Sequence, residues 1–189
     1  MQLKFAALLN KPKLRIGMAI HTPMHHATAM IMLRILKEST ENVVFMQNQG
    51  DFWQHHTWAH AANASSKRLT FDDQFTYHYD NDAWRKHIST MDVFVSGRIH
   101  GAMMAISAGV PTIIIPNDMR LLELAEVMKL PIVRKPLATD DIYSLIKSIT
   151  FDGKAFDHNR AQVARKYKQS FDSFGILMNP TVVGLIKED

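Results

Sequence analysis

The sequence predicts an α/β protein built on a parallel β-sheet. Several runs of about four to six residues are almost entirely apolar, as in strands that are buried on both faces. Segments with apolar residues at helical spacing alternate with these runs, and a length of 189 residues suits one domain. We therefore expect a single doubly wound, Rossmann-like domain over residues 1–189, with a parallel sheet of five to six strands, helices on both faces and a helical C-terminus.

The individual elements follow from the apolar pattern and from capping residues. Strands are expected at 13–20, 42–46, 75–79, 92–95 and 112–115, with a short one at 132–133. Helices are expected at 2–10, from Pro23 to Leu36, and at 52–63, 83–90, 99–108, 119–128 and 140–149. Residues 155–189 are expected to form C-terminal helices, with breaks at Gly175 and Pro180. Asp82 is expected to cap the helix at 83–90, and Thr139 or Asp140 the helix at 140–149.

Composition limits the class of protein and its location. Apolar residues make up 47% of the chain and charged residues 21%, a balance typical of a folded globular protein. No apolar run approaches the roughly 18 residues that a membrane span needs, and Met1 is not followed by a signal-type segment. We therefore expect a cytoplasmic protein without an integral membrane segment. Cysteine is absent, which excludes disulfides and thiolate metal sites.

The chain is basic, with a net charge of +4 and a pI near 9.3. This charge favours anionic partners. The basic residues form small groups at 11–15, 134–135 and 160–168, and aromatic residues are not interleaved with them as in single-stranded nucleic-acid sites. We therefore interpret each group as a solvated face and expect no nucleic-acid partner, whereas phosphate on a small molecule or on a lipid-linked glycan would be attracted.

The chemistry is concentrated in the segment SGRIHG, where the strand at 92–95 turns into the helix at 99–108. In doubly wound sheets, ligands bind at such carboxyl ends of strands, beside helix N-termini, whose free N–H groups attract anions. Arg98 adds a planar fork for phosphate or carboxylate, and His100 adds a group that exchanges protons near neutral pH. Gly97 is expected to give the turn its backbone freedom, and Gly101 to allow close approach to the helix backbone.

The next strand end carries a second polar group. Asp118, Arg120 and Glu123 follow the strand at 112–115. Since neighbouring parallel strands end at the same edge of a sheet, two arginines and a histidine are expected to converge there. A structural role for Arg98 and His100, as a capping residue and a buried histidine, remains the alternative that the SGRIHG segment leaves open.

These residues resemble a known family. The run WRKHISTMDVFVSGRIHGAMMAISAGVPTIIIPNDMRLLELAEVMKLPIV, residues 84–133, is similar to the signature region of the polysaccharide pyruvyl transferases. A tryptophan-bearing helix, an R-x-H-G turn, a G-V-P and a D-x-R-x-x-E follow one another as in that family, and residues 13–50 fit more loosely. The position after Arg120, often threonine in the family, is Leu121, which removes a hydroxyl contact.

The resemblance implies transfer of pyruvate from phosphoenolpyruvate to sugar hydroxyls during surface-polysaccharide biosynthesis. The family is similar to two-domain B-type glycosyltransferases, and its motif lies in the C-terminal, donor-binding half. His100 would act as the catalytic group, and the donor would be bound by Ser96, Gly97, Arg98, Gly101, Asp118, Arg120 and Glu123. Phosphoenolpyruvate would be a co-substrate, with no cofactor and no metal. The acceptor would be a saccharide or lipid-linked glycan, with an N-terminal partner domain, in the cytoplasm or at the inner face of the membrane.

Two other functions stay open at this point. One is a B-type glycosyltransferase domain that binds a nucleotide sugar, in which Glu123 would hold a ribose. The other is a non-catalytic donor-binding module that lacks its partner half. A compact dianion suits Arg98 and His100 better than a base and a ribose do, which favours the pyruvyl transferase.

The remaining histidines were considered as metal ligands. His21 with His25, and His56 with His60, have the i, i+4 spacing of zinc-binding pairs on a helix. Pro23 interrupts the first pair, and neither pair lies in an H-E-x-x-H pattern. We therefore expect no metal site, although His21 ends the first predicted strand on the ligand side of the sheet and is a possible substrate contact.

Overall fold

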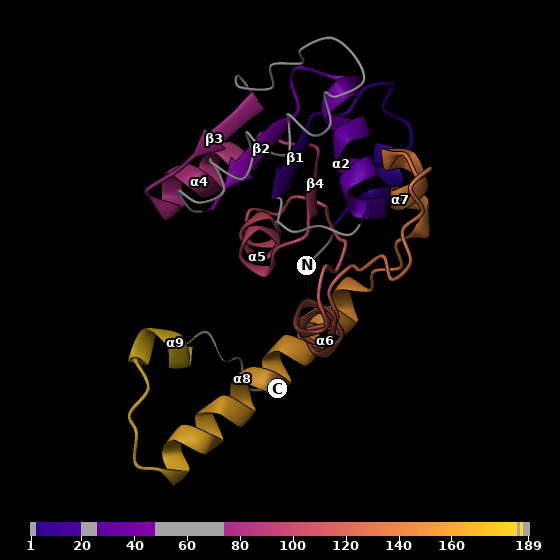
Figure 1. The fold of residues 1–189 in the computed structure, drawn as a ribbon. Helices are drawn as coiled ribbons and strands as arrows, with labels where there is room; N and C mark the ends of the chain where they lie inside the picture. Colours follow the sequence, from indigo (N-terminus) through magenta and orange to yellow (C-terminus); the bar gives the residue numbers. More distant parts are fainter. Residues whose placement is uncertain (1–2, 20–25, 48–73, 185, 187–189) are drawn as a thin grey trace.

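A computed structural model describes residues 3–19, 26–47, 74–184 and 186. Within these ranges, one parallel sheet has the strand order β3-β2-β1-β4-β5 (Figure 1). Its strands are β1 (Ile16–Ala19), β2 (Val43–Met46), β3 (Phe75–Tyr77), β4 (Val93–Ser96) and β5 (Thr112–Ile114). The predicted fold class is confirmed: the chain is a doubly wound α/β protein with a helical C-terminus.

Helices cover both faces of the sheet because successive strand residues point to opposite sides. They are α1 (Phe5–Leu8), α2 (His26–Glu38), α4 (Asn81–Ile88), α5 (Ile99–Ser107), α6 (Met119–Val127), α7 (Ile142–Ser148), α8 (Gly153–Ser173) and α9 (Pro180–Gly184). On one face, Val93 and Val95 of β4 pack in a cluster with residues of α2 and α7. On the other face, Phe94 packs in a cluster with residues of α4 and α5.

The sheet changes its direction of winding between β1 and β4. The connection through α2 leads outward from β1 to β2, and the connections through α4 and α5 lead through β4 to β5. Residues Ile16 to Ala19 pair directly with Val93 to Ser96 at this junction. Ligands of doubly wound sheets bind outside the carboxyl ends of the strands at this kind of switch point, which here is where Ala19 and Ser96 lie.

Several predicted boundaries need correction. The helix expected at 2–10 is confined to the four residues of α1, and 132–133 forms only an isolated bridge from Ile132 to Ile114, so the described part of the sheet has five strands. The helix expected at 52–63 lies outside the described residues. Of the breaks expected in the C-terminal helices, Gly175 has a positive φ of 66°, and Pro180 is the first residue of α9, where its fixed φ suits a helix start.

Two predicted helix caps are wrong by one or two residues. The side chain of Asp80, not Asp82, accepts a hydrogen bond from the N–H of Ala83 at 2.7 Å. Asp141, not Thr139 or Asp140, caps α7. Asp140 instead accepts a hydrogen bond from the N–H of Leu137. Where acidic residues cluster, the residue with extended backbone directly before the helix is the one that caps it.

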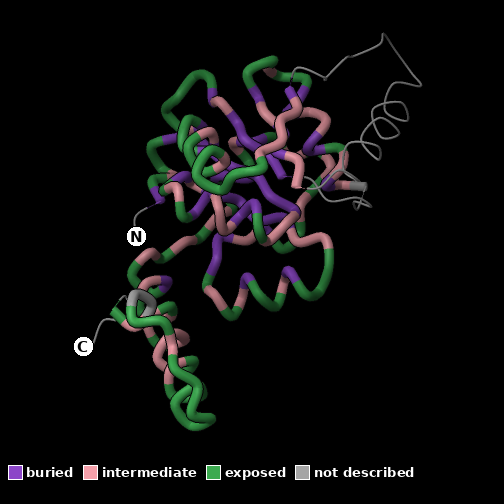
Figure 2. The backbone as a smooth tube through the Cα atoms, turned by 90° about the vertical axis from the view of Figure 1, so that its left-hand side faces the viewer, coloured by how far each residue is buried: buried purple, intermediate pink, exposed green. Residues whose placement is uncertain are grey.

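The C-terminal part of the chain leaves the body of the protein. Phe156, in the first turn of α8, is buried in a cluster with residues of α5 and α6, and it is the only buried residue of α8. Beyond this turn α8 runs away from the sheet, and its outer end is the part farthest from it (Figures 1 and 2). We call residues 160–178 the C-terminal arm. No helix among the described residues is long and apolar enough to cross a membrane.

Candidate functional site

Ser96 shapes the turn at the end of β4. Its side chain is fully buried. The hydroxyl group donates a hydrogen bond to the carbonyl oxygen of Arg98 at 2.6 Å and accepts one from the N–H of Arg98 at 3.1 Å. Backbone hydrogen bonds hold the turn on either side. The N–H of Gly97 donates to the carbonyl oxygen of Ala19, and the carbonyl oxygen of Ser96 accepts a hydrogen bond from the N–H of Ile115. The turn is therefore fixed to both neighbouring strands, and the Ser96 hydroxyl is occupied in holding the backbone of Arg98.

Gly97 lies in this turn for a reason other than the predicted one. Among the described glycines only Gly109 and Gly175 have a positive φ, so Gly97 does not use the left-handed conformation that favours glycine. A Cβ atom at position 97 would contact only the carbonyl oxygen of Ile115, at an ordinary 3.7 Å. The expectation that the turn needs the backbone freedom of Gly97 is wrong. The effect of the missing side chain is to leave the space above the turn open.

Gly101 is required by packing inside the protein. A Cβ atom at this position would lie 2.5 Å from Cβ of Ala19, 2.7 Å from Nε2 of Gln47 and 3.3 Å from Oγ of Ser96. The close approach expected at Gly101 is therefore made by the ends of β1, β2 and β4 themselves. This approach seats the first turn of α5 against three strand ends, which fixes the direction in which the helix N-terminus points.

The N-terminus of α5 differs from those of the neighbouring helices. The helices α4, α6, α7 and α8 each begin after an aspartate whose side chain accepts a hydrogen bond from the first turn. The corresponding residue of α5 is Arg98, whose side chain makes no capping bond. A cation at this position cannot satisfy the N–H groups of the first turn, and it adds positive charge to that of the helix dipole. The local arrangement favours an external anion.

The predicted cationic residues at the turn are accessible to different extents. Arg98 is half-buried, whereas His100, the second residue of α5, is exposed. A half-buried guanidinium at a fixed backbone position is held in a narrower range of directions than a surface arginine. The geometry therefore separates a positioned cation, Arg98, from a solvent-accessible imidazole two residues later.

The second loop ends at the same edge of the sheet. Val95 and Ser96 pair with Ile113 and Ile114, so the chain leaves β4 and β5 side by side. Asp118 caps α6 by accepting the N–H of Leu121 at 2.7 Å.

Arg120 and Glu123 follow on the exposed first turn of α6. Nη2 of Arg120 lies 3.9 Å from Oδ2 of Asp118, and the arginine side chain is 78% exposed. The topology thus brings both loops to one edge, with Asp118 acting as a helix cap and Arg120 exposed to solvent.

One residue at this edge was not singled out from the sequence. Gln47 directly follows β2, and its side-chain nitrogen lies beside the first turn of α5. Its position after an apolar strand is the same signal that identified Ser96 at the end of β4. His21, His25, His56 and His60 lie outside the described residues.

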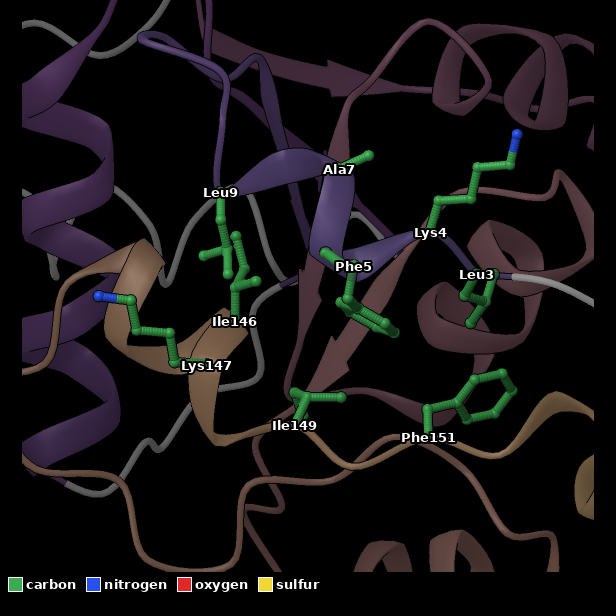
Figure 3. Close-up of a pocket in the computed structure, with 10 residues that line it drawn as sticks. Leu3, Lys4, Phe5, Ala7, Leu9, Ile146, Lys147, Ile149 and Phe151 are labelled. Atoms are coloured by element: carbon green, nitrogen blue, oxygen red, sulfur yellow. The ribbon is translucent and has the colours of Figure 1, made fainter.

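Outside the Ser96 turn, two other kinds of feature could bind a ligand, a cluster of metal-ligating side chains and a cavity. In the described ranges, no three histidine, aspartate or glutamate side chains lie close enough together to hold a metal ion. An open cavity of about 650 Å³ lies between α1 and the segment that ends α7 (Figure 3). Its walls are mostly apolar, with Lys4 and Lys147 as the charged lining residues, and it contains none of the predicted site residues.

Comparison with known proteins gives one family match. The family model described as polysaccharide pyruvyl transferase matches residues 33–119. This range includes the whole turn from Ser96 to Gly101 and the helix cap Asp118, and it ends before Arg120 and Glu123. No curated protein matches the chain.

Proposed function

We propose that this chain, which the polysaccharide pyruvyl transferase model matches over residues 33–119, transfers pyruvate from phosphoenolpyruvate to hydroxyl groups of a saccharide. The match supports a transferase that acts on a saccharide acceptor. We propose phosphoenolpyruvate as the donor, pyruvate transfer as the reaction and the turn from Ser96 to Gly101, with Asp118, Arg120 and Glu123, as the site. The proposal includes the two-domain B-type glycosyltransferase-like arrangement that the sequence resemblance implies.

The observation that carries the proposal is the N-terminus of α5. It lies at the switch point of the sheet, and Arg98 stands there in place of the aspartate that caps four other helices. Phosphoenolpyruvate has a phosphate and a carboxylate within a few bond lengths of each other. One anion would take the first-turn N–H groups and the other the guanidinium of Arg98, with Arg120 of the adjacent loop as a second cation.

Each residue has a distinct role in this proposal. Ser96 and Gly101 act indirectly, because the first holds the backbone of Arg98 and the second seats α5 against the strand ends. Gly97 leaves the space open in which the donor lies. Asp118 caps α6, the helix that carries the exposed Arg120 and Glu123, which are proposed to contact the donor.

The reaction needs a proton donor and a stabilised leaving group. A proton from the imidazolium of His100 goes to the terminal carbon of the enol, and an oxygen of the acceptor bonds to the central carbon. The bond from that carbon to the phosphate oxygen then breaks, and a second hydroxyl oxygen of the acceptor takes its place, giving a ketal. Each hydroxyl group releases one proton: one returns to His100, and the other leaves with phosphate. Phosphoenolpyruvate is a co-substrate, and this sequence of steps requires no cofactor.

The acceptor side of the site is proposed to come from an N-terminal partner domain. The acceptor is a saccharide or a lipid-linked glycan of surface-polysaccharide biosynthesis. Such a reaction takes place in the cytoplasm or at the inner face of the membrane, where phosphoenolpyruvate is available.

Calorimetric titration of phosphoenolpyruvate into the chain tests the donor site. We expect binding that Arg98→Ala weakens by about 10-fold or more, because a charge-assisted hydrogen bond typically contributes roughly 1.5–3 kcal/mol. Arg85→Ala, which removes an exposed arginine of α4, is the matched control and should bind normally. A panel of nucleotides and nucleotide sugars is titrated in parallel.

The outcomes separate the alternative functions. Binding of a nucleotide sugar in place of phosphoenolpyruvate would establish the glycosyltransferase alternative. Donor binding that depends on Arg98 but gives no ketal product with any acceptor, even when a partner domain is supplied, would establish a non-catalytic binding module. Binding that Arg98→Ala leaves unchanged would place the donor elsewhere in the chain.

A further inference from the structure

The C-terminal arm exposes a concentration of apolar side chains. Among the described residues, twelve large apolar side chains are exposed, and five of them lie between positions 167 and 177. These five are Tyr167, Phe171, Phe174, Ile176 and Leu177. Phe174 is 79% exposed and Leu177 is 96% exposed. Single exposed apolar residues are ordinary, but a continuous group at the end of a projecting helix is typical of an interaction surface.

The apolar residues of the arm continue one face of α8. Phe156, Val163, Tyr167, Phe171 and Phe174 are spaced by three, four or seven residues, so they follow one side of the helix. At the inner end of this side, Phe156 is buried against α5 and α6. The same side of the helix continues past the body of the protein without a cover from the sheet or its helices (Figures 1 and 2).

Basic residues flank this apolar side. The helix α8 contains five lysines and arginines but only two carboxylates, Asp157 and Asp172. At 100° per residue, Lys166 and Lys168 lie on the two sides of Tyr167. Long cationic side chains beside an apolar stripe can extend to phosphate groups while their stems cover apolar surface. Lys168 is also paired with Asp172 at 2.7 Å, but cations outnumber carboxylates on α8. An apolar side on such a basic helix is complementary to the interface of an anionic bilayer.

We propose that the C-terminal arm docks this protein on an anionic phospholipid membrane. Phe171, Phe174 and Leu177 enter the interface, and Lys166 contacts lipid phosphates. Among the described residues, the outer end of α8 lies farthest from the sheet, so docking there leaves the Arg98 turn free for its ligands. The proposal rests on the arm alone and is independent of the donor that binds at the turn.

Flotation with vesicles of stated composition tests the proposal on the full chain. We expect binding to vesicles with 30% phosphatidylglycerol in phosphatidylcholine, and at least 10-fold weaker binding to phosphatidylcholine alone. The double variant F174S/L177S should lose at least 10-fold in affinity for the anionic vesicles. Lys166→Glu should weaken binding at low salt and have a smaller effect in 0.5 M salt, because screening already removes the attraction there.

Matched variants keep the test specific. Leu137→Ser removes an apolar side chain that is 62% exposed outside the arm, and Lys135→Glu reverses an exposed charge there; both should bind vesicles normally. All variants should retain the thermal midpoint of the wild type, since every altered side chain is exposed. Absence of vesicle binding, or binding that F174S/L177S leaves unchanged, would overturn the proposal. A dimer in sedimentation that F174S/L177S dissociates, without vesicle binding, would assign the arm to a second copy of the chain.

Discussion

Nε2 of His78 lies 3.0 Å from Nδ1 of His87, so a single proton joins the two imidazole rings. Both rings pack on Phe45, with centroid distances of 6.1 Å for His78 and 4.9 Å for His87. Burial, His78 and Arg15 together lower the pKa of His87 below its ordinary value. The pair connects the end of β3 to α4.

The stability of the protein is expected to fall as the pH is lowered through this pair. A histidine whose pKa is lower in the folded state stabilises the fold above its ordinary pKa of about 6.5, and this contribution is lost as the pH falls toward the folded value. The free energy of unfolding, measured in urea at pH 5, 6 and 7, should therefore rise with pH. The substitution His87→Gln should reduce the slope of this rise. The exposed His158→Gln is the control and should keep the wild-type slope. Equal slopes for His87→Gln and the wild type would contradict the prediction.

Two glycines of the candidate site should respond differently to alanine. Gly101→Ala places a methyl group 2.5 Å from Cβ of Ala19 and should lower the free energy of unfolding by about 1–3 kcal/mol. Gly97→Ala makes only an ordinary contact and should change the free energy of unfolding by less than about 0.5 kcal/mol. Chemical denaturation measures both.

Ligand binding then separates packing from function at position 97. If the donor lies above the turn, Gly97→Ala should weaken phosphoenolpyruvate binding in a protein of normal stability. Normal binding by this variant would show that the donor does not approach the turn closely.

A buried asparagine should be among the most sensitive polar positions. Asn42 accepts the N–H of Ile16 through Oδ1 and donates through Nδ2 to the carbonyl oxygen of Ile35, and its side chain is 1% exposed. Asn42→Ala leaves both groups without their partner and should cost roughly 2–6 kcal/mol, at about 1–3 kcal/mol for each buried group. Asn159→Ala, which removes a surface hydrogen bond to the carbonyl oxygen of Val127, is the control. Similar losses of unfolding free energy for both variants would contradict the prediction.

The ends of α5 and α6 offer a matched pair of substitutions. Each helix ends with two hydrogen bonds back to its last turn, through Gly109 and Val110 in α5 and through Lys129 and Leu130 in α6. Gly109 has a φ of 76° and Lys129 a φ of 56°. Lys129→Gly should therefore stabilise the protein by about 0.5–1 kcal/mol, and Gly109→Ala should destabilise it by a similar amount. Thermal unfolding measures both; a loss of stability in Lys129→Gly would contradict the assignment of strain to position 129.

The sequence predicts the sheet well because each strand is a nearly continuous apolar run. Val93 to Val95 and Thr112 to Ile114 were located within one or two residues for this reason. Helix starts were less certain where several acidic residues compete: Asp80 and Asp82, or Asp140 and Asp141, have the same capping chemistry, and only the backbone conformation selects between them.

The candidate site could be predicted in outline but not in its internal contacts. The alternation of strands and helices and the R-x-H-G pattern were enough to place Arg98 at the carboxyl end of a strand of the sheet. The roles of Ser96 and Gly101 depend on distances to Arg98, Ala19 and Gln47 across three strands, and such distances have no local signal in the sequence. The pairing of His78 with His87 was not predicted for the same reason.

The place of β4 between β1 and β5 also determines when the candidate site can form as the chain folds. Arg15 and Asp92, 77 positions apart, are joined at the start of the β1–β4 pairing. Closing so long a loop is entropically costly, so this pairing is expected to be slower than the formation of the helices. The turn at Ser96 lies at the end of that pairing and is held by Ala19 on one side and Ile115 on the other. A partly folded chain is therefore expected to have its helices before it has this turn, and any ligand of the turn would select the chain in which β1 and β4 are already paired.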